Sequence, residues 1–357
     1  MSSFIYTARP CRVLFGAGTL AKLPSELFRQ NLKAALVLST PFQQPEALAV
    51  TQQLGTVAVG IFSEATMHTP LPVTERGIQE ARLKRADCVI SIGGGSTTGL
   101  GKAISIRTGL PHISIPTTYA GSEMTPHLGE TVDGIKTTRS DPAIQPATVL
   151  YDVNLTMSLP GEMSATSGIN AIAHAVEALY APDTNPIIRL MALEGVRVLA
   201  ESLPLVATDE SNAEARYQAL YGAWLCGTCL GSTTMSLHHK LCHVIGGSFN
   251  MPHAETHTIL LPHTIAYNIP SMPEVNADLA GVLPCADGNS ITGLNNLLEK
   301  LGVRRALQSY GLKEGDIEKA AMIAVKNPYA NPRPVEKEKI QELLRRAWAG
   351  EAARADM

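Results

Sequence analysis

The sequence is short of aromatic residues, of charge of either sign and of long apolar runs. Aromatic residues make up 5% and charged residues 17% of the 357 residues, against 45% hydrophobic residues. A folded core must therefore consist mainly of Leu, Ile, Val, Ala and Met. The formal net charge of −3 argues against a general affinity for nucleic acids, which requires a basic surface. An anionic ligand must be held by local positive groups instead.

Membrane and secretion signals are also lacking. No apolar run reaches the roughly 18 residues of a transmembrane helix, and the opening residues MSSFIYTARP lack the apolar segment of a secretory signal. Six cysteines lie scattered, and the CxxC pair of Cys226 and Cys229 has no second pair to complete a zinc site. We therefore expect a cytoplasmic protein with reduced thiols and a structural role for the pair of Cys226 and Cys229.

Short apolar runs alternate with helical stretches in the first 155 residues. The runs are rich in β-branched residues and almost continuously apolar, as in parallel strands covered on both faces; they span 34–39, 57–62, 87–93, 112–117 and 147–152. This alternation predicts a doubly wound α/β domain. The Asp-Gly pair within 128–142 predicts a hairpin.

Helical periodicity dominates from about residue 156 onward. We therefore predict two domains, a dinucleotide-binding α/β domain over 1–155 and an all-helical catalytic domain over 156–357.

A glycine-rich turn follows the third apolar run. Gly93, Gly94 and Gly95 allow a sharp turn and a close approach of the backbone to a ligand. Ser96 then falls at the start of a helix, where hydroxyls and backbone N–H groups face an anion. The segment is neither a Walker A loop nor a clean GxGxxG fingerprint. It favours phosphate binding, although such turns also occur for structural reasons.

The next strand end strengthens that interpretation. Thr117, Thr118 and Ser122 follow the run at 112–117, so two strand ends with small hydroxylated residues predict one dinucleotide across the sheet edge. The first run ends at Ser39 and Thr40, where an acidic residue would select against a 2′-phosphate. Both NADH and NADPH are therefore considered as the cofactor.

Histidines gather in one segment of the second domain. Six of the ten histidines lie between His238 and His263, and the pairs His239/His243 and His253/His257 have the spacing of one helix face. Imidazoles near neutral pH suit both metal binding and proton transfer. We expect His238 and His263 themselves to be structural.

A helix expected over 164–182 has Asn170, His174 and Glu177 on the side opposite its apolar stripe. This side is either a solvated surface or the polar wall of a cleft. A carboxylate added to the imidazoles would suit Zn²⁺ or Fe²⁺, but the position that would supply it is the amide of Asn170. We therefore expect no metal, with the histidines and Lys240 polarising the substrate and donating protons.

Several segments together resemble the iron-containing alcohol dehydrogenase superfamily: IGGGSTTGLGKAIS, IPTTYAGSEMT, GINAIAHAVEALY, CHVIGGSFNMPHAETHTILLPH and NPRP. The resemblance covers nearly the whole chain and is strongest to the maleylacetate reductase branch. It implies a dinucleotide-binding α/β domain followed by a helical domain. It also implies reduction of the carbon–carbon double bond of maleylacetate, a dicarboxylate, to 3-oxoadipate with NADH or NADPH, in the degradation of aromatic compounds.

The resemblance also suggests roles for individual residues. The Asp, His, His, His ligands of metal-dependent members fall here on Asn170, His174, His243 and His253. We assign His243 and His253 to enolate stabilisation or proton donation. Lys240 and His174 are assigned to the orientation of the substrate or of a carboxylate, and Asn170 to an amide hydrogen bond.

Other roles remain open on sequence alone. Arg333 of the NPRP segment either contacts a substrate carboxylate or forms a structural salt bridge. The alternative functions are a metal-dependent alcohol or polyol dehydrogenase of the same superfamily, a lyase similar to dehydroquinate synthase, and a nucleotide-binding protein without turnover. A homodimer is expected because two-fold homo-oligomers are common.

Overall fold

The structure is a computed structural model that describes residues 3–8, 11–133, 135–326 and 329–356. The chain divides into two compact units. One comprises Ala8–Leu159, and the other comprises Met1–Thr7 with Pro160–Met357. No helix among the described residues has both the length and the apolar character needed to cross a membrane.

The α/β unit is built on a six-stranded sheet in which all pairs are parallel. Its strands, in the order β1-β8-β5-β4-β2-β3 across the sheet, are β1 (Arg12–Phe15), β8 (Thr148–Tyr151), β5 (His112–Pro116), β4 (Cys88–Gly93), β2 (Ala35–Leu38) and β3 (Ala58–Phe62). The doubly wound sheet predicted from the apolar runs is confirmed. The edge strand β1 was not among the predicted runs.

Side chains alternate between the two faces of this sheet and helices cover both. The helices are α1 (Leu23–Arg29), α2 (Gln44–Leu54), α3 (Leu71–Leu83) and α4 (Gly95–Thr108). On β2, Val37 packs with residues of α1 and α2, whereas Leu36 and Leu38 pack with residues of α3 and α4. Burial on both faces explains why the strand sequences are apolar without interruption.

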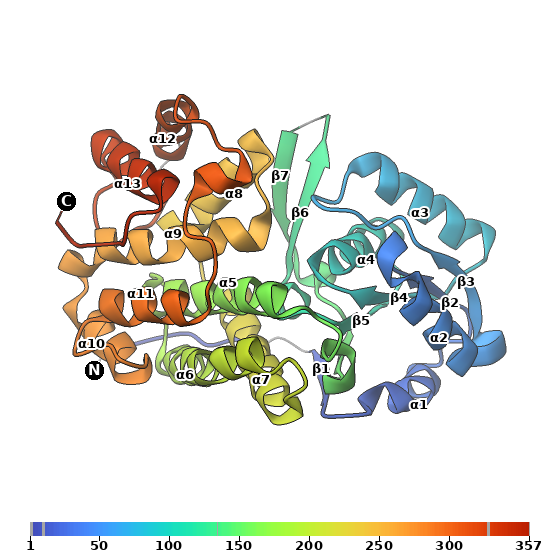
Figure 1. The fold of residues 1–357 in the computed structure, drawn as a ribbon. Helices are drawn as coiled ribbons and strands as arrows, with labels where there is room; N and C mark the ends of the chain where they lie inside the picture. Colours follow the sequence, from blue (N-terminus) through green and yellow to red (C-terminus); the bar gives the residue numbers. More distant parts are fainter. Residues whose placement is uncertain (1–2, 9–10, 134, 327–328, 357) are drawn as a thin grey trace. The chain divides into compact units, whose positions relative to one another are not determined.

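The predicted hairpin is also confirmed. Strands β6 (His127–Val132) and β7 (Ile135–Ser140) pair antiparallel and form a separate two-stranded ribbon in Figure 1.

The second unit is helical. Its helices are α5 (Gly161–Tyr180), α6 (Pro186–Thr208), α7 (Ala213–Ser232), α8 (Leu237–Phe249), α9 (His253–Asn268), α10 (Pro273–Val282), α11 (Ser290–Lys300), α12 (Asp316–Lys326) and α13 (Lys337–Ala349). Helix α9 packs against both α5 and α8. These three helices are the ones that contain the predicted catalytic histidines.

Candidate active site

The strand ends with polar residues lie next to one another in the α/β unit. Strands β5, β4 and β2 are neighbours, and β3 lies on the far side of β2. The chain therefore winds in one direction from β2 to β3 and in the other direction from β4 onward. The carboxyl ends of β2 and β4 thus form a switch point, where open α/β sheets bind their ligands.

Two of these strand ends are joined by a glutamine that the sequence did not single out. Thr40 caps the 3-10 turn Pro41–Gln43 by accepting a hydrogen bond from the Gln43 N–H at 3.3 Å. The Gln43 side chain donates from Nε2 to Thr117 Oγ1 at 2.8 Å. The loop after β2 is thereby fixed to the residue after β5.

The three glycines of the turn differ in what surrounds them. Gly93 has a φ of +149°, and a Cβ on it would lie 2.5 Å from Thr97 Oγ1. A Cβ on Gly94 would lie 3.0 Å from Thr118 Cγ2. A Cβ on Gly95 would meet only Ala120, at 3.9 Å, among the described residues. Neighbouring protein atoms thus leave little room for a side chain at positions 93 and 94. At position 95, the first residue of α4, the space is open.

The remaining predicted cofactor residues divide into two groups. Ser96 is half-buried in the first turn of α4, and Thr118 is half-buried above Gly94. Ser122 instead accepts a hydrogen bond from Lys102 Nζ at 3.3 Å. Burial lowers the pKa of Lys102 to about 7 against the opposing charge of Glu123. Lys102 also donates to Thr125 Oγ1 at 2.9 Å, so Ser122 belongs to a buried network.

In the helical unit, Glu177 anchors a chain of two imidazoles. Glu177 Oε2 accepts from His239 Nδ1 at 2.7 Å, and His239 Nε2 lies 2.9 Å from His174 Nδ1. Glu177 also accepts from the backbone N–H groups of Ser236 at 2.9 Å and His238 at 2.7 Å. Burial raises the pKa of Glu177, but the charge and hydrogen bond of His239 outweigh it, so the pKa lies below its usual value. Glu177 is therefore an ionised carboxylate.

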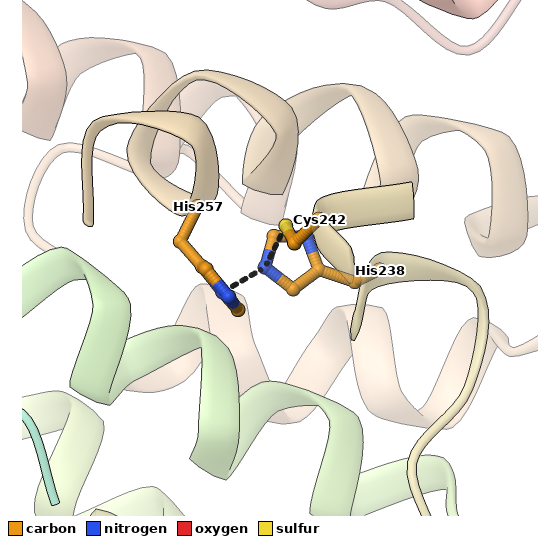
Figure 2. Close-up of side chains that lie close together, drawn as sticks. All are labelled: His238, Cys242 and His257. Atoms are coloured by element: carbon orange, nitrogen blue, oxygen red, sulfur yellow. Dashed lines mark hydrogen bonds between the residues drawn. The ribbon is translucent and has the colours of Figure 1, made fainter. Parts of the chain in front are cut away.

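A second chain runs through His238 and His257 on α8 and α9. His238 Nδ1 lies 3.1 Å from Thr264 Oγ1, and His238 Nε2 lies 2.9 Å from His257 Nδ1. Cys242 Sγ lies 3.6 Å from His238 Nε2, and Figure 2 shows the three side chains converging. Both imidazoles are fully buried, and burial holds the pKa of each well below its usual value. His238 and His257 are therefore neutral.

His243 and His253 occupy a different position from the buried imidazoles. Both are half-buried, whereas His174, His239 and His257 are at most 4% exposed. The His253 ring centroid lies 4.4 Å from that of His257, and the His243 centroid lies 6.2 Å from that of His239. Each half-buried histidine thus contacts one of the two series of buried imidazoles: His243 contacts His239, and His253 contacts His257.

Three further predicted residues lie on the helices of the cluster or contact one of them. Asn170 is 2% exposed on α5, so it is part of a buried wall. The Lys240 ammonium stands 5.7 Å from the centre of the Tyr329 ring. Arg333 donates to the backbone carbonyl of Tyr267 at 2.9 Å, and its guanidinium lies 4.5 Å from the centre of the Tyr267 ring. Arg333 is therefore held by Tyr267.

The idea of a solvated polar face on the helix at 164–182 is wrong, because Glu177 is fully buried and His174 is 3% exposed. Sequence reasoning missed the roles of His239, His257 and Glu177. On sequence alone Glu177 is only a neighbour of His174, and the available signal is a carboxylate three residues after a histidine on an expected helix. His263 is buried in α9 and takes no part in these contacts among the described residues, while His238 is a member of the cluster.

Comparison with known proteins decides the family. A sequence profile described as iron-containing alcohol dehydrogenase matches residues 10–153, and the profile of the C-terminal part of the Fe-containing alcohol dehydrogenase family matches residues 164–348. The chain belongs to the iron-containing alcohol dehydrogenase family.

Within this family the chain is similar to several maleylacetate reductases. It is 52% identical to that of Rhizobium sp. (strain MTP-10005), over 98% of this chain and 99% of the relative. It is 51% identical to that of Sphingobium indicum, over 97% of this chain and 98% of the relative. The crystal structure of maleylacetate reductase from Agrobacterium tumefaciens matches with a TM-score of 0.94 and 51% identity, over 99% of this chain and 100% of that one.

The name of the family implies an iron ion, but the donor atoms at the corresponding positions do not suit one. Biological Fe²⁺ sites of this kind combine imidazoles with a carboxylate. Asn170 offers a neutral amide, and Glu177 directs its oxygens to His239 and to two backbone N–H groups. His174 and His239 are hydrogen-bonded to each other. An anionic oxygen ligand is therefore lacking from this part of the described structure.

Proposed function

We propose that this member of the family reduces the carbon–carbon double bond of maleylacetate, giving 3-oxoadipate, with NADH or NADPH as the reductant. The single observation that supports this most directly is the imidazole cluster, in which half-exposed His243 and His253 contact two buried and oriented chains. The similarity to maleylacetate reductases extends over 98% of the chain. In such an enzyme the pathway is the degradation of aromatic compounds.

The reaction makes three demands on the protein. Reduced nicotinamide supplies a hydride to the alkene carbon β to the ketone. Negative charge then develops on the ketone oxygen, and the α carbon must receive a proton. The protein must therefore stabilise an oxyanion, supply that proton and hold two carboxylates.

His253 and His243 are the proposed groups for the oxyanion and the proton. Each is accessible enough to meet a substrate, and each has a buried imidazole behind it. An imidazole with a reference pKa of about 6.5 can donate and recover a proton near neutral pH.

Glu177 and Thr264 are the proposed anchors of the two buried chains. The ionised carboxylate of Glu177 accepts from His239 Nδ1 and so fixes the tautomer and orientation of that ring, whose Nε2 faces His174 Nδ1. Thr264 Oγ1 donates to the Leu261 carbonyl at 2.9 Å, so it accepts from His238 Nδ1. His257 Nδ1 then donates to His238 Nε2. The two series of hydrogen-bonded imidazoles thus differ in their anchor: an ionised carboxylate for His239 and His174, and a neutral hydroxyl for His238 and His257.

Asn170, His174 and Lys240 are proposed to orient the dicarboxylate. The Asn170 amide can donate a hydrogen bond where a metal-binding carboxylate would repel an anionic substrate. The Lys240 ammonium supplies positive charge. Arg333 is assigned a structural role because it is already held by Tyr267.

The nucleotide is proposed to bind at the switch point of the α/β unit. Gly94, Gly95 and Ser96 would receive the diphosphate at the start of α4, and Thr40, Thr117 and Thr118 line the adjacent strand ends. The space left open by Gly95 supports this. Ser122 is proposed to act on the nucleotide indirectly, because its hydroxyl accepts a hydrogen bond from Lys102. With Thr40 in place of an acidic residue, NADPH is accepted as well as NADH.

The proposal extends to the organisation of the enzyme. Residues 1–155 are proposed as the nucleotide-binding domain and 156–357 as the catalytic domain. The enzyme is proposed to act as a cytoplasmic homodimer without a metal. None of the six cysteines, all of which the structure describes, forms a disulfide, in keeping with a reducing compartment. Sedimentation analysis of the purified chain tests the dimer.

Turnover with two substrates tests the activity. Purified protein is mixed with freshly generated maleylacetate and NADH, with NADPH in a parallel assay, and the product is identified by mass spectrometry. We expect consumption of one NADH per 3-oxoadipate formed. Oxidation of primary alcohols or diols with NAD⁺, without reduction of maleylacetate, would instead establish the alcohol dehydrogenase alternative.

A further inference from the structure

Two imidazoles of the cluster lie beside a thiol that has no part in the proposed reaction. His238, Cys242 and His257 place one ligand atom each within 4.8 Å of the other two, and all three residues are at most 1% exposed. Figure 2 shows His238 and Cys242 on α8 and His257 on α9, pointing toward one another. Cys242 contributes a thiol, which neither proton transfer nor substrate binding requires here.

Two of the three distances between these ligand atoms are close to those around a tetrahedral ion. Bonds of about 2.3 Å to sulfur and about 2.05 Å to nitrogen place the sulfur and nitrogen ligands roughly 3.6 Å apart, and two nitrogens roughly 3.3 Å apart. Cys242 Sγ and His238 Nε2 are 3.6 Å apart, and His238 Nε2 and His257 Nδ1 are 2.9 Å apart. The two imidazole nitrogens must separate by a few tenths of an ångström, and the ligand atoms of Cys242 and His257 lie within 4.8 Å of each other.

The protons of the grouping also permit coordination. Because His238 Nδ1 carries the proton and donates it to Thr264, His238 Nε2 has a lone pair. This lone pair faces the space between His238, Cys242 and His257. His257 Nδ1 donates to that lone pair, and His257 Nε2 is buried without a hydrogen-bond partner among the described residues. A move of the His257 proton from Nδ1 to Nε2 frees the second lone pair. The Cys242 thiol loses its proton to solvent on binding, which provides the anionic ligand.

We propose that His238, Cys242 and His257 bind a thiophilic divalent cation, Zn²⁺ or Cd²⁺, and that the bound ion inhibits the enzyme. The thiolate and two imidazoles favour such ions over Mg²⁺ or Ca²⁺, which prefer oxygen ligands. The inhibitory effect rests on the proposed function, because the ion replaces the His238–His257 hydrogen bond that orients the neutral chain.

Direct binding of Cd²⁺ is the first test. Chelator-treated protein is titrated with Cd²⁺, and the ultraviolet charge-transfer band of the thiolate–Cd²⁺ bond is recorded. All measurements use a Cys285→Ser background, which removes the exposed thiol. We expect one equivalent to bind per chain. Cys242→Ser should abolish the band, and the control Cys229→Ser, at a buried cysteine of α7, should retain it. A band of unchanged intensity in Cys242→Ser would overturn the site.

A second variant guards against misfolding of the first. His257→Gln keeps the thiol and should weaken Cd²⁺ binding by at least about 100-fold, since it removes one of three protein ligands. Unchanged affinity in this variant would equally refute the proposal. Thermal unfolding confirms that each variant is folded before titration.

Inhibition is measured separately from binding. Each variant is assayed for maleylacetate reduction with and without Zn²⁺, and its rate is compared with its own metal-free rate. Wild type should lose at least about tenfold in rate, whereas Cys242→Ser should lose less than twofold. A Cd²⁺ band in a protein that never reduces maleylacetate would refute the proposed function and leave the site standing. Full activity without a band would refute the site and leave the function standing.

Discussion

The two functional regions of this molecule are built in opposite ways. At the sheet edge, the proposed nucleotide site has open space at Gly95 and a half-buried Ser96. In the helical unit, His174, His239, His238 and His257 are buried and hydrogen-bonded to one another or to Glu177. A binding site for a nucleotide requires room, whereas a site that handles protons requires fixed tautomers. The difference suggests separate ways to damage each region.

Acid should affect the helical unit before the α/β unit, and this is the largest effect expected. Burial lowers the pKa of His263 to about 4 and that of His112 to about 3, and it lowers the pKa values of His238 and His257 well below normal. The unfolded state therefore binds more protons than the folded state below about pH 6.5. Stability falls with falling pH by about 1.4 kcal/mol per histidine per pH unit. Three of the four histidines lie in the helical unit.

Hydrogen exchange followed by mass spectrometry can separate the two units. Between pH 6.5 and 5, we expect peptides from α8 and α9 to lose protection earlier than peptides from β4 and β5. Glu177 does not alter the sign in this window, because its lowered pKa keeps it ionised in the folded state. Earlier loss of protection in the α/β unit would contradict the assignment of neutral buried imidazoles.

Glu177→Gln should damage the histidine cluster most among single substitutions. Both Glu177 oxygens accept hydrogen bonds, so the NH₂ group of the amide would face a donor, and the anionic acceptor of His239 Nδ1 would be lost. Loss of one partner of a buried pair costs about 3 kcal/mol in unfolding free energy. We also expect kcat to fall roughly 100-fold, with a changed pH profile. Glu162→Gln, an exposed position on the same helix, should match wild type in both measurements.

His253→Ala and His243→Ala should each lower kcat/KM by about 100-fold, the usual value of a positioned proton donor. Their folding should be less affected than that of Glu177→Gln because both side chains are half-buried. His127→Ala, at a half-buried histidine of β6, is the matched control. A kcat/KM within twofold of wild type in both cluster variants would remove these histidines from the mechanism.

Gly95→Ala should affect only the nucleotide. The new methyl group meets only Ala120 at 3.9 Å among the described residues, so folding should be unchanged. It occupies space at the start of α4, and the KM for NADH should rise roughly tenfold, equivalent to about 1.4 kcal/mol. Gly281→Ala, where a Cβ has open space, is the control and should leave KM unchanged. Tight NADH binding by Gly95→Ala would mean that the diphosphate lies elsewhere.

The two regions also differ in what the sequence could predict. The glycine turn and the strand runs are contiguous, so β4, β5 and the residues after them were located to within one or two positions. The cluster depends on how α5, α8 and α9 pack. The spacing of four residues placed His239 and His243 on one face, but it did not indicate which of them meets His174. Packing gives that contact to His239.

The sequence shows that the polar side of α5 has an amide at Asn170, but it does not show that this side is buried. Asn170 could be recognised from sequence as an amide in place of a carboxylate, because the replacement needs no structural context. The same pattern of polar residues on α5 suited a solvated face equally well. Only the packing of α9 against α5 distinguishes the two. Gln43 was overlooked for a similar reason, since its bond to Thr117 joins residues 74 positions apart.

The most direct test of the central claim is turnover without metal. Protein is stripped with a chelator, residual Fe and Zn are determined by elemental analysis, and NADH oxidation with fresh maleylacetate is followed. Rapid turnover with far less than one metal ion per chain is the result expected if imidazoles alone stabilise the enolate and supply its proton. Activity that disappears on stripping and returns with Fe²⁺ or Zn²⁺ would contradict that account.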